Sequence, residues 1–117
     1  MIAHQWDVVQ ASLDPVEGSE QAGIRPVLVI SREAVHAPLP VVAVLPLTSH
    51  KPGRRVYATE VRLEQGTAGL PASSLVMAHQ VRTVSRSRLL KRYGTLRDKA
   101  LQEQVHQALR VFLDLED

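Results

Sequence analysis

One arginine closes a polar loop and stands directly before a proline and an apolar run. The loop and the run together are DPVEGSEQAGIRPVLVIS, residues 14–31, and the arginine is Arg25. A guanidinium presents a planar fork of N–H donors that matches two oxygens of a phosphate. Because Pro26 fixes its own φ and suits the start of a strand, we expect Arg25 to be held at the rim of a small core. From composition, a surface salt bridge to Glu20 or Asp14 is the commoner role for such an arginine, and a phosphate site is the functional alternative.

Other polar side chains stand near the ends of the predicted strands. Thr48 directly follows an apolar run, where its hydroxyl serves either a reaction or the capping of a turn. The polar set beside the strand ends comprises Ser19, Glu20, Gln21, Arg25, Thr48, Ser49, Gln80 and Arg82. From the residues alone, this set predicts a small β-rich domain with an anion site.

Several kinds of chemistry lack their residues in this chain. There is no cysteine, which excludes disulfides, thiolate metal sites and cysteine nucleophiles. The sequence contains neither a G-x-S-x-G nucleophile elbow nor a phosphate loop that ends in G-K-[ST]. The five histidines show no paired spacing typical of metal ligands. We therefore expect no metal and no nucleotide cofactor.

Length and composition indicate one globular domain over residues 1–117. The hydrophobic fraction of 44% is ordinary, but only four residues are Phe, Trp or Tyr, so the core must consist of Val, Leu, Ile and Ala. No apolar run reaches the roughly 18 residues of a membrane span, and the N-terminus lacks a signal-peptide pattern. With no cysteine to oxidise, we expect a cytoplasmic protein.

The charge is distributed unevenly along the chain. The net charge is only +2, but residues 82–99 hold seven basic side chains and one acidic side chain. The last four residues include three acids. A basic stretch beside an acidic tail fits either a nucleic-acid face or a solvated charged surface.

The hydrophobic pattern predicts mainly strands. We expect strands over residues 8–13, 26–31, 41–47, 56–63, 74–78, 80–84 and 89–93, with loops over 14–24 and 32–40. Pro46 lies inside one of these runs and lacks an N–H donor, which predicts an edge position or a bulge.

A single helix is expected at the C-terminal end of the chain. Thr95 and Asp98 form a capping pattern after Gly94. Apolar residues then recur at helical spacing at Leu101, Val105, Ala108, Leu109, Phe112 and Leu113. Several short strands followed by one helix predict a mainly β fold, a small barrel of five or more strands that a C-terminal helix caps.

Three segments in order resemble the MazF/PemK family of toxins. They are L-D-P followed by G-S-E-Q-A-G-x-R-P, then P-L-T-S at residues 46–49, then H-Q-V-R-T-V at residues 79–84 before G-T-L. The resemblance covers the chain from end to end and implies an SH3-like β-barrel of five to seven strands with a C-terminal helix. The chain departs from the family at Trp6, where glycine is common, and at His79, where an acid is usual.

The resemblance implies the toxin of a type II toxin–antitoxin system that acts as a homodimer. The implied activity is sequence-specific, ribosome-independent and metal-independent cleavage of single-stranded RNA, and the implied partner is an antitoxin with a disordered acidic tail. In the family, the residues that correspond to Arg25 and Thr48 are catalytic. We therefore expect cleavage that is confined to unpaired RNA and weakened by salt.

Our mechanistic hypothesis is attack by the 2′-hydroxyl of the RNA on the adjacent phosphorus, which leaves a 2′,3′-cyclic phosphate and a 5′-hydroxyl. Arg25 stabilises the charge on phosphorus, Thr48 donates a hydrogen bond, and Glu20 is the candidate proton acceptor. The expected RNA-binding residues are Ser19, Gln21, Ser49, Lys51, Arg54, Gln80 and Arg82.

Two other functions remain open from the sequence. One is a non-catalytic toxin on the same barrel that poisons a protein such as DNA gyrase. The other is a nucleic-acid-binding module that has lost catalysis, because one displaced loop is enough to abolish a reaction. The presence of both Arg25 and Thr48 in their motifs argues against the first.

Overall fold

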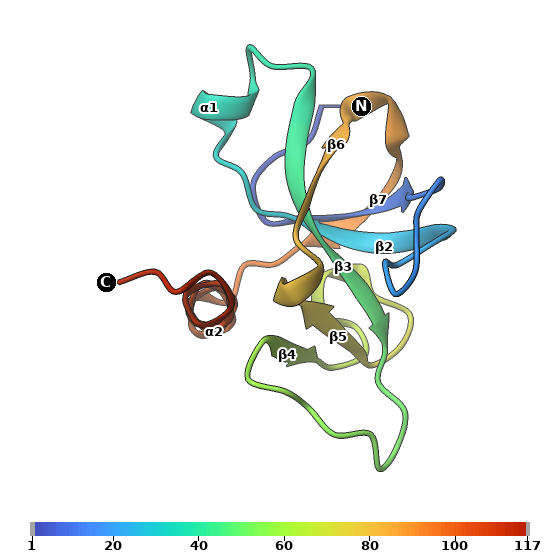
Figure 1. Ribbon diagram of the computed structural model, residues 1–117, viewed down its shortest axis with the longest axis vertical. Helices are drawn as coiled ribbons and strands as arrows, with labels where there is room; N and C mark the ends of the chain where they lie inside the picture. Colours follow the sequence, from blue (N-terminus) through green and yellow to red (C-terminus); the bar gives the residue numbers. More distant parts are fainter. Residues whose placement is uncertain (1, 117) are drawn as a thin grey trace.

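A computed structural model describes residues 2–116 and has seven antiparallel strands with a C-terminal helix (Figure 1). The strands are β1 (Asp7–Ser12), β2 (Ile24–Val29), β3 (Val41–Ser49), β4 (Glu60–Leu63), β5 (Ser74–Met77), β6 (Arg82–Ser85) and β7 (Leu89–Thr95). The helices are α1 (Glu33–His36) and α2 (Lys99–Leu113). Three single 3₁₀ turns are η1 (Thr67–Gly69), η2 (Ala78–Gln80) and η3 (Arg86–Arg88).

The strands form one curved sheet in the order β4-β5-β3-β2-β1-β7, and β6 pairs with β3 beside that path. The long strand β3 is the centre, because it pairs with β2, β5 and β6. The prediction of a mainly β, barrel-like fold with a C-terminal helix is confirmed, and the strand number is the upper one expected. The path is open, with β4 and β7 at its two ends.

Pro46 lies in this central strand, so the predicted edge position was wrong. On one side it stands opposite Val27 of β2. On the other side, residues 41–44 of β3 pair with β6 and residues 47–49 pair with β5. Pro46 thus falls between the two ladders, where β3 changes its neighbour and a missing N–H interrupts neither of them.

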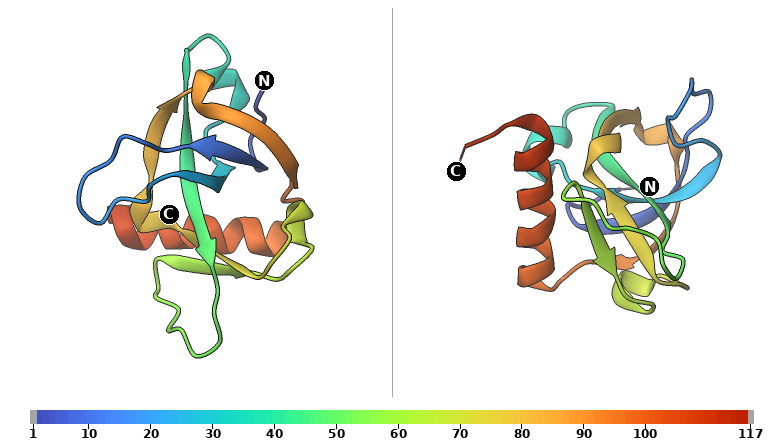
Figure 2. Two further views of the ribbon diagram at one scale, coloured as in Figure 1. Left: turned by 90° about the vertical axis from the view of Figure 1, so that its right-hand side faces the viewer. Right: turned by 60° about the horizontal axis from the view of Figure 1, so that its bottom comes forward.

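Alternating side chains of the strands fill two hydrophobic clusters. In β1, Val8 belongs to one cluster and Val9 to the other, because successive residues of a strand point to opposite faces. The Val8 cluster also receives Leu96, Val105 and Ala108 from the α2 region. The helix α2 accordingly lies along one side of the strands (Figure 2).

The helix α2 begins later than its capping pattern predicted. Its N-cap is Asp98, whose Oδ1 accepts hydrogen bonds from the backbone N–H groups of Ala100 (2.9 Å) and Leu101 (3.1 Å). Thr95 instead ends β7, and its hydroxyl donates to Oδ1 of the buried Asp7 at 2.8 Å. The Thr95 hydroxyl therefore bonds to Asp7 and does not cap the helix.

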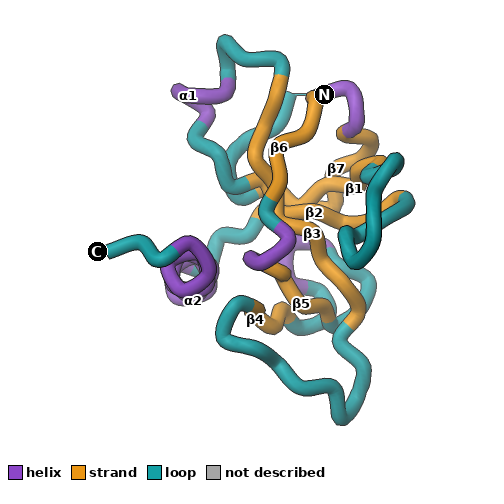
Figure 3. Tube along the Cα trace, in the orientation of Figure 1, coloured by secondary structure: helices purple, strands orange, loops and turns teal. Residues whose placement is uncertain are grey.

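Other element boundaries also differ from the predictions; for example, β2 is Ile24–Val29 where a strand over 26–31 was expected. The expected strand over 56–63 is ordered only from Glu60, because a turn joins Tyr57 and Glu60 through the Glu60 N–H and the Tyr57 carbonyl at 2.9 Å. The predicted loop 32–40 contains the short helix α1. The predicted strand 80–84 begins at Arg82, since Gln80 belongs to η2. Figure 3 shows the long loops from β1 to β2 and from β3 to β4 projecting from the strands.

Among residues 2–116, no helix combines the length and the apolar character that a membrane crossing requires.

Trp6 has a left-handed backbone, with a φ of 75°. Its N–H donates to Val29 and its carbonyl accepts from Leu96, so both neighbours hold this conformation. The indole packs on the core, and its centroid lies 5.1 Å from that of the His106 ring. Glycine would adopt this φ without strain, whereas an L side chain is strained there.

We expect Trp6→Gly to be more stable than Trp6→Ala by about 1 kcal/mol, since alanine retains the left-handed strain and glycine does not. Both variants should be less stable than the parent, by about 1–3 kcal/mol, because each loses the partly buried indole. Urea unfolding of the three proteins measures both differences. An alanine variant as stable as the glycine variant would contradict a strained backbone at this residue.

Candidate active site

A pocket of about 100 Å³ lies where β2 begins and β3 ends. Its walls include Arg25 and Pro26 from β2, Thr48 and Ser49 from β3, and the segment from Leu70 to Ser74. In the β2–β3 ladder Val27 stands opposite Pro46, and the same register extended by two residues brings Arg25 opposite Thr48. The two side chains of the sequence motifs thus face one pocket.

The guanidinium of Arg25 is held by one hydrogen bond to the backbone. Its Nε donates to the Ala22 carbonyl at 2.9 Å. Among residues 2–116 no ion pair involves Arg25, so the alternative of a salt bridge to Glu20 or Asp14 is not observed. A half-buried cation fixed through Nε leaves its terminal N–H groups to an anion.

The structure does not bring Glu20 to Arg25. The Glu20 side chain is exposed, and its Oε1 accepts a hydrogen bond from the Glu17 N–H at 2.7 Å. Within the described chain no hydrogen bond or ion pair joins Glu20 to Arg25. The carboxylate that we predicted as the proton acceptor therefore bonds to the backbone of its own loop and not to Arg25.

Gln80 of η2 makes two hydrogen bonds to the loop between β1 and β2. The Gln80 Nε2 donates to the Ser19 carbonyl at 3.0 Å, and its Oε1 accepts from the Gln21 N–H at 3.3 Å. Ser19, Gln21 and Gln80, which were all predicted to contact RNA, thus lie together. The bonds between them join the Gln80 side chain to backbone groups of the other two. The side-chain oxygen of Gln21 is buried and has no hydrogen-bond partner among the described residues, so a donor from a ligand would satisfy it.

Arg54, which we predicted as a phosphate contact, is paired within the protein. Its Nη1 and Nη2 donate to the two carboxylate oxygens of Glu60 at 3.0 and 2.9 Å. The Glu60 side chain has no exposed surface, whereas that of Arg54 is 33% exposed. This pair and the hydrogen bond from the Tyr57 N–H fasten the loop between β3 and β4.

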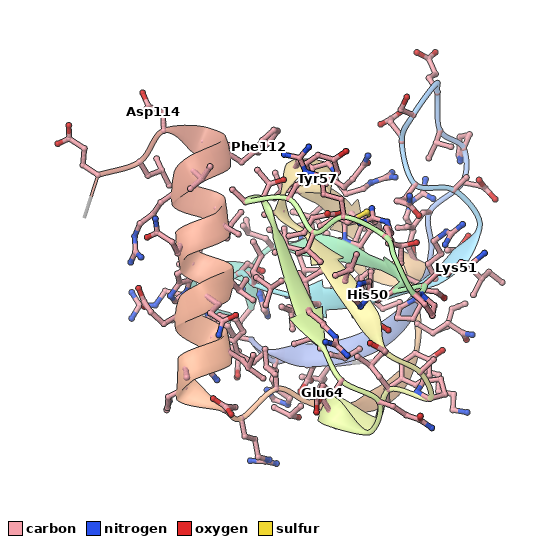
Figure 4. All side chains as sticks on the ribbon, turned by 90° about the horizontal axis from the view of Figure 1, so that it is seen from below. His50, Lys51, Tyr57, Glu64, Phe112 and Asp114 are labelled. Atoms are coloured by element: carbon pink, nitrogen blue, oxygen red, sulfur yellow. The ribbon has the colours of Figure 1, made fainter. Side chains whose placement is uncertain are left out.

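The Glu60 carboxyl has a pKa below its ordinary value. Burial by itself raises the pKa of this group, but the hydrogen bonds from Arg54 and from the Tyr57 N–H, with the Arg54 charge, outweigh burial. For the same reason the carboxylate raises the pKa of Arg54. Lys51, on the same loop, is exposed and lies on the side of the molecule away from α2 (Figure 4).

A family model described as the PemK-like, MazF-like toxin of type II toxin–antitoxin systems matches residues 4–113. This chain belongs to that toxin family. It is 35% identical over 109 residues to Endoribonuclease MazF of Staphylococcus saprophyticus, a match that covers 93% of this chain and 89% of that one. It is 33% identical to Endoribonuclease EndoA of Bacillus subtilis over 117 residues, which cover 100% and 99% of the two chains.

The fold of this toxin is also that of solved MazF structures. The crystal structure of MazF from Deinococcus radiodurans superimposes with a TM-score of 0.82 at 27% identity, and the match covers 98% of this chain and 99% of that one. The match in fold and the match in sequence therefore extend over nearly the same length.

His79 precedes Gln80, the residue that bonds to the loop between β1 and β2. The His79 Nδ1 lies 2.9 Å from the Thr59 hydroxyl, and its ring centroid lies 6.5 Å from that of Phe112 in α2. Figure 4 places Phe112 near the C-terminal end of α2, on the same side of that view as Tyr57. The imidazole therefore connects η2 to α2 and to Thr59, the residue before β4.

The basic stretch of the toxin does not form one open cationic face. Arg82, Arg86, Arg88 and Arg92 all donate hydrogen bonds to backbone carbonyls of the N-terminal half of the chain. Arg92 also pairs with the buried Asp7 at 3.0 Å. These four arginines therefore join distant segments of the chain. Neither a nucleic-acid face nor a solvated charged surface, the two interpretations of the charge pattern, predicted this role.

No pattern in the sequence predicted the pocket wall from Leu70 to Ser74 or the partner of Arg54. The wall joins the site because Ser74 of β5 stands opposite Ser49 at the end of β3. No local pattern marks this wall, since other loops of the chain also lead into short apolar strands. Among residues 2–116, no group of three or more His, Asp or Glu side chains is arranged to hold a metal ion.

Proposed function

We propose that this toxin is an endoribonuclease that cuts single-stranded RNA at specific sequences, without a ribosome or a metal ion. The observation that carries the proposal is the common pocket of Arg25 and Thr48, a free cationic fork beside a hydroxyl. Two relatives at 33% and 35% identity are endoribonucleases by name, which supports the same activity here.

The chemistry that fits this pocket is transphosphorylation within the RNA. The 2′-oxygen forms a bond to the adjacent phosphorus, and the bond from phosphorus to the 5′-oxygen breaks, which gives a 2′,3′-cyclic phosphate and a 5′-hydroxyl. Arg25 stabilises the negative charge on the non-bridging oxygens, and the Thr48 hydroxyl donates a hydrogen bond to one of them. No protein nucleophile is needed.

Two proton transfers accompany the reaction. A guanidinium stays protonated at neutral pH, so it is a poor base but can donate a proton to the leaving 5′-oxygen. Glu20 remains our candidate acceptor for the 2′-hydroxyl proton, and RNA binding would have to draw its carboxylate away from the Glu17 N–H. A carboxylate beside bound phosphate and Arg25 would then complete the acid–base pair.

For RNA binding we propose Ser19, Gln21, Ser49, Lys51 and Arg82. Ser49 lines the pocket at the end of β3, and the exposed Lys51 follows on the loop between β3 and β4. The buried, unpartnered oxygen of Gln21 suits an N–H donor on a base edge. We assign Arg54 to holding its loop through Glu60, because both of its terminal nitrogens are engaged there.

We propose that the toxin works as a homodimer in the cytoplasm and that its antitoxin has an acidic disordered tail. The family description, a toxin of a type II toxin–antitoxin system, supports such a partner. An acidic tail complements the cation of Arg25 and would compete with RNA phosphate for it.

The decisive experiment is cleavage of a long, end-labelled single-stranded RNA by the purified toxin in excess EDTA. Discrete cuts that carry 2′,3′-cyclic phosphates, absent from the same RNA in duplex form and weakened by added salt, are the expected result. Intact RNA over a wide range of sequences would overturn the proposal and favour a binding module or a gyrase poison.

A further inference from the structure

The loop between β1 and β2 carries much of the proposed site but makes few hydrogen bonds of its own. At its base the Leu13 N–H donates to the Gly23 carbonyl and the Gly23 N–H donates to Asp14 Oδ1. Near its tip only Glu17 and Glu20 bond to each other. Most of the loop is exposed, so its position depends on contacts from elsewhere.

Those contacts come from residues 80–88, far along the chain. Arg82 donates to the Leu13 carbonyl at 3.2 Å, and Arg88 donates to the carbonyls of Ser12 (3.2 Å) and Asp14. Both arginines hold the base of the loop. Gln80 holds the second half of the loop, through the Ser19 carbonyl and the Gln21 N–H.

The contact at Gln21 connects directly to the reactive cation. The residue that follows Gln21 is Ala22, and the Ala22 carbonyl accepts the hydrogen bond from Arg25 Nε. The Gln80 amide therefore fixes one end of the Gln21–Ala22 backbone, and the other end orients the guanidinium. Displacement of this backbone would rotate Arg25 away from the pocket that it shares with Thr48.

We propose that Gln80 is a positioning residue, which holds Arg25 in its productive orientation through the backbone of Gln21 and Ala22. This role rests on the proposed endoribonuclease function and replaces the role in RNA binding that the sequence predicted for Gln80. Both hydrogen-bonding groups of its amide are already occupied by the loop, and its bonds to backbone atoms do not depend on the side chains of Ser19 and Gln21.

The test uses Gln80→Met, which keeps the length of the side chain and removes both hydrogen bonds. Gln104→Met is the matched control, because Gln104 is exposed on α2. In the RNA-free protein, amide hydrogen exchange of residues 14–24 should accelerate in Gln80→Met and stay unchanged in Gln104→Met. Equal exchange in the parent and in Gln80→Met would overturn the proposal.

Cleavage kinetics separate positioning from base recognition. Under single turnover, Gln80→Met should lower the rate about 10- to 100-fold and by the same factor at every cut site. The set of cut sequences and the affinity for an RNA blocked at the 2′-position should be retained. A changed set of cut sequences at an unchanged rate would show base recognition and overturn the proposal.

A double-mutant cycle shows whether Gln80 acts through Arg25. In an Arg25→Lys background the effect of Gln80→Met should nearly vanish, because the lysine lacks the Nε that the Ala22 carbonyl orients. Full retention of the effect would overturn the proposed route. Absence of cutting by the parent protein would overturn the endoribonuclease function itself, whereas normal cutting by both parent and Gln80→Met would overturn only the role of Gln80.

Discussion

Replacement of Arg25 by alanine is expected to lower the single-turnover rate of RNA cleavage by about 1000-fold, because it removes the cation that faces charge developing on phosphorus. Arg25→Lys restores the charge without the fork of donors and should recover only part of the rate. Neither variant should change the urea midpoint appreciably, since no ion pair among the described residues involves Arg25. The measurement is the cleavage of one end-labelled RNA with excess enzyme.

Arg97→Ala is the matched control for this loss of charge. Arg97 is exposed on the segment between β7 and α2 and lies outside the pocket of Arg25. The Arg97→Ala variant should cleave RNA at nearly the parent rate, with at most a small loss of RNA affinity through the reduced positive charge. If Arg25→Ala and Arg97→Ala slowed cleavage equally, Arg25 would supply only general attraction for RNA.

Replacement of Glu60 by alanine is expected to destabilise the protein by about 2–3 kcal/mol, because hydrogen bonds to a buried charged group are lost and the Tyr57 N–H is left without its partner. The Glu60 side chain is fully buried and accepts from both terminal nitrogens of Arg54. Glu64→Ala is the control, since Glu64 is an exposed acid just after the same strand. Its effect on urea unfolding should stay within about 0.5 kcal/mol.

The Glu60 pair should also make stability depend on pH on the acidic side. The pKa of Glu60 is lower in the folded protein than in the unfolded chain, where it is about 4.3. The unfolded chain therefore binds the proton first, so this stabilisation is complete above the unfolded pKa and is lost as pH falls through the folded one. Urea midpoints measured from neutral pH down to about pH 3 should fall less steeply in Glu60→Gln than in the parent. Equal slopes would contradict a lowered pKa for this carboxyl.

Patterns in the sequence determined the kinds of element and the order in which they follow. Alternation in β1 places Val8 and Val9 in different clusters, and the apolar repeat of α2 puts Val105 and Ala108 in the core. Such patterns are visible because strand and helix periodicity act over a few residues. The position of Arg25 before Pro26, at the end of a glycine-containing loop, also indicated the candidate site without any knowledge of its partners.

Only the tertiary structure decided which polar groups meet. Thr95 has a local cap available but donates to Asp7, and Arg54 is taken by Glu60. Gln80 reaches the loop across about sixty positions, and Arg88 reaches Asp14 across 74. These partners depend on strand register and on how the sheet curves, and a polar side chain carries no local signal of which distant backbone group the fold will bring to it.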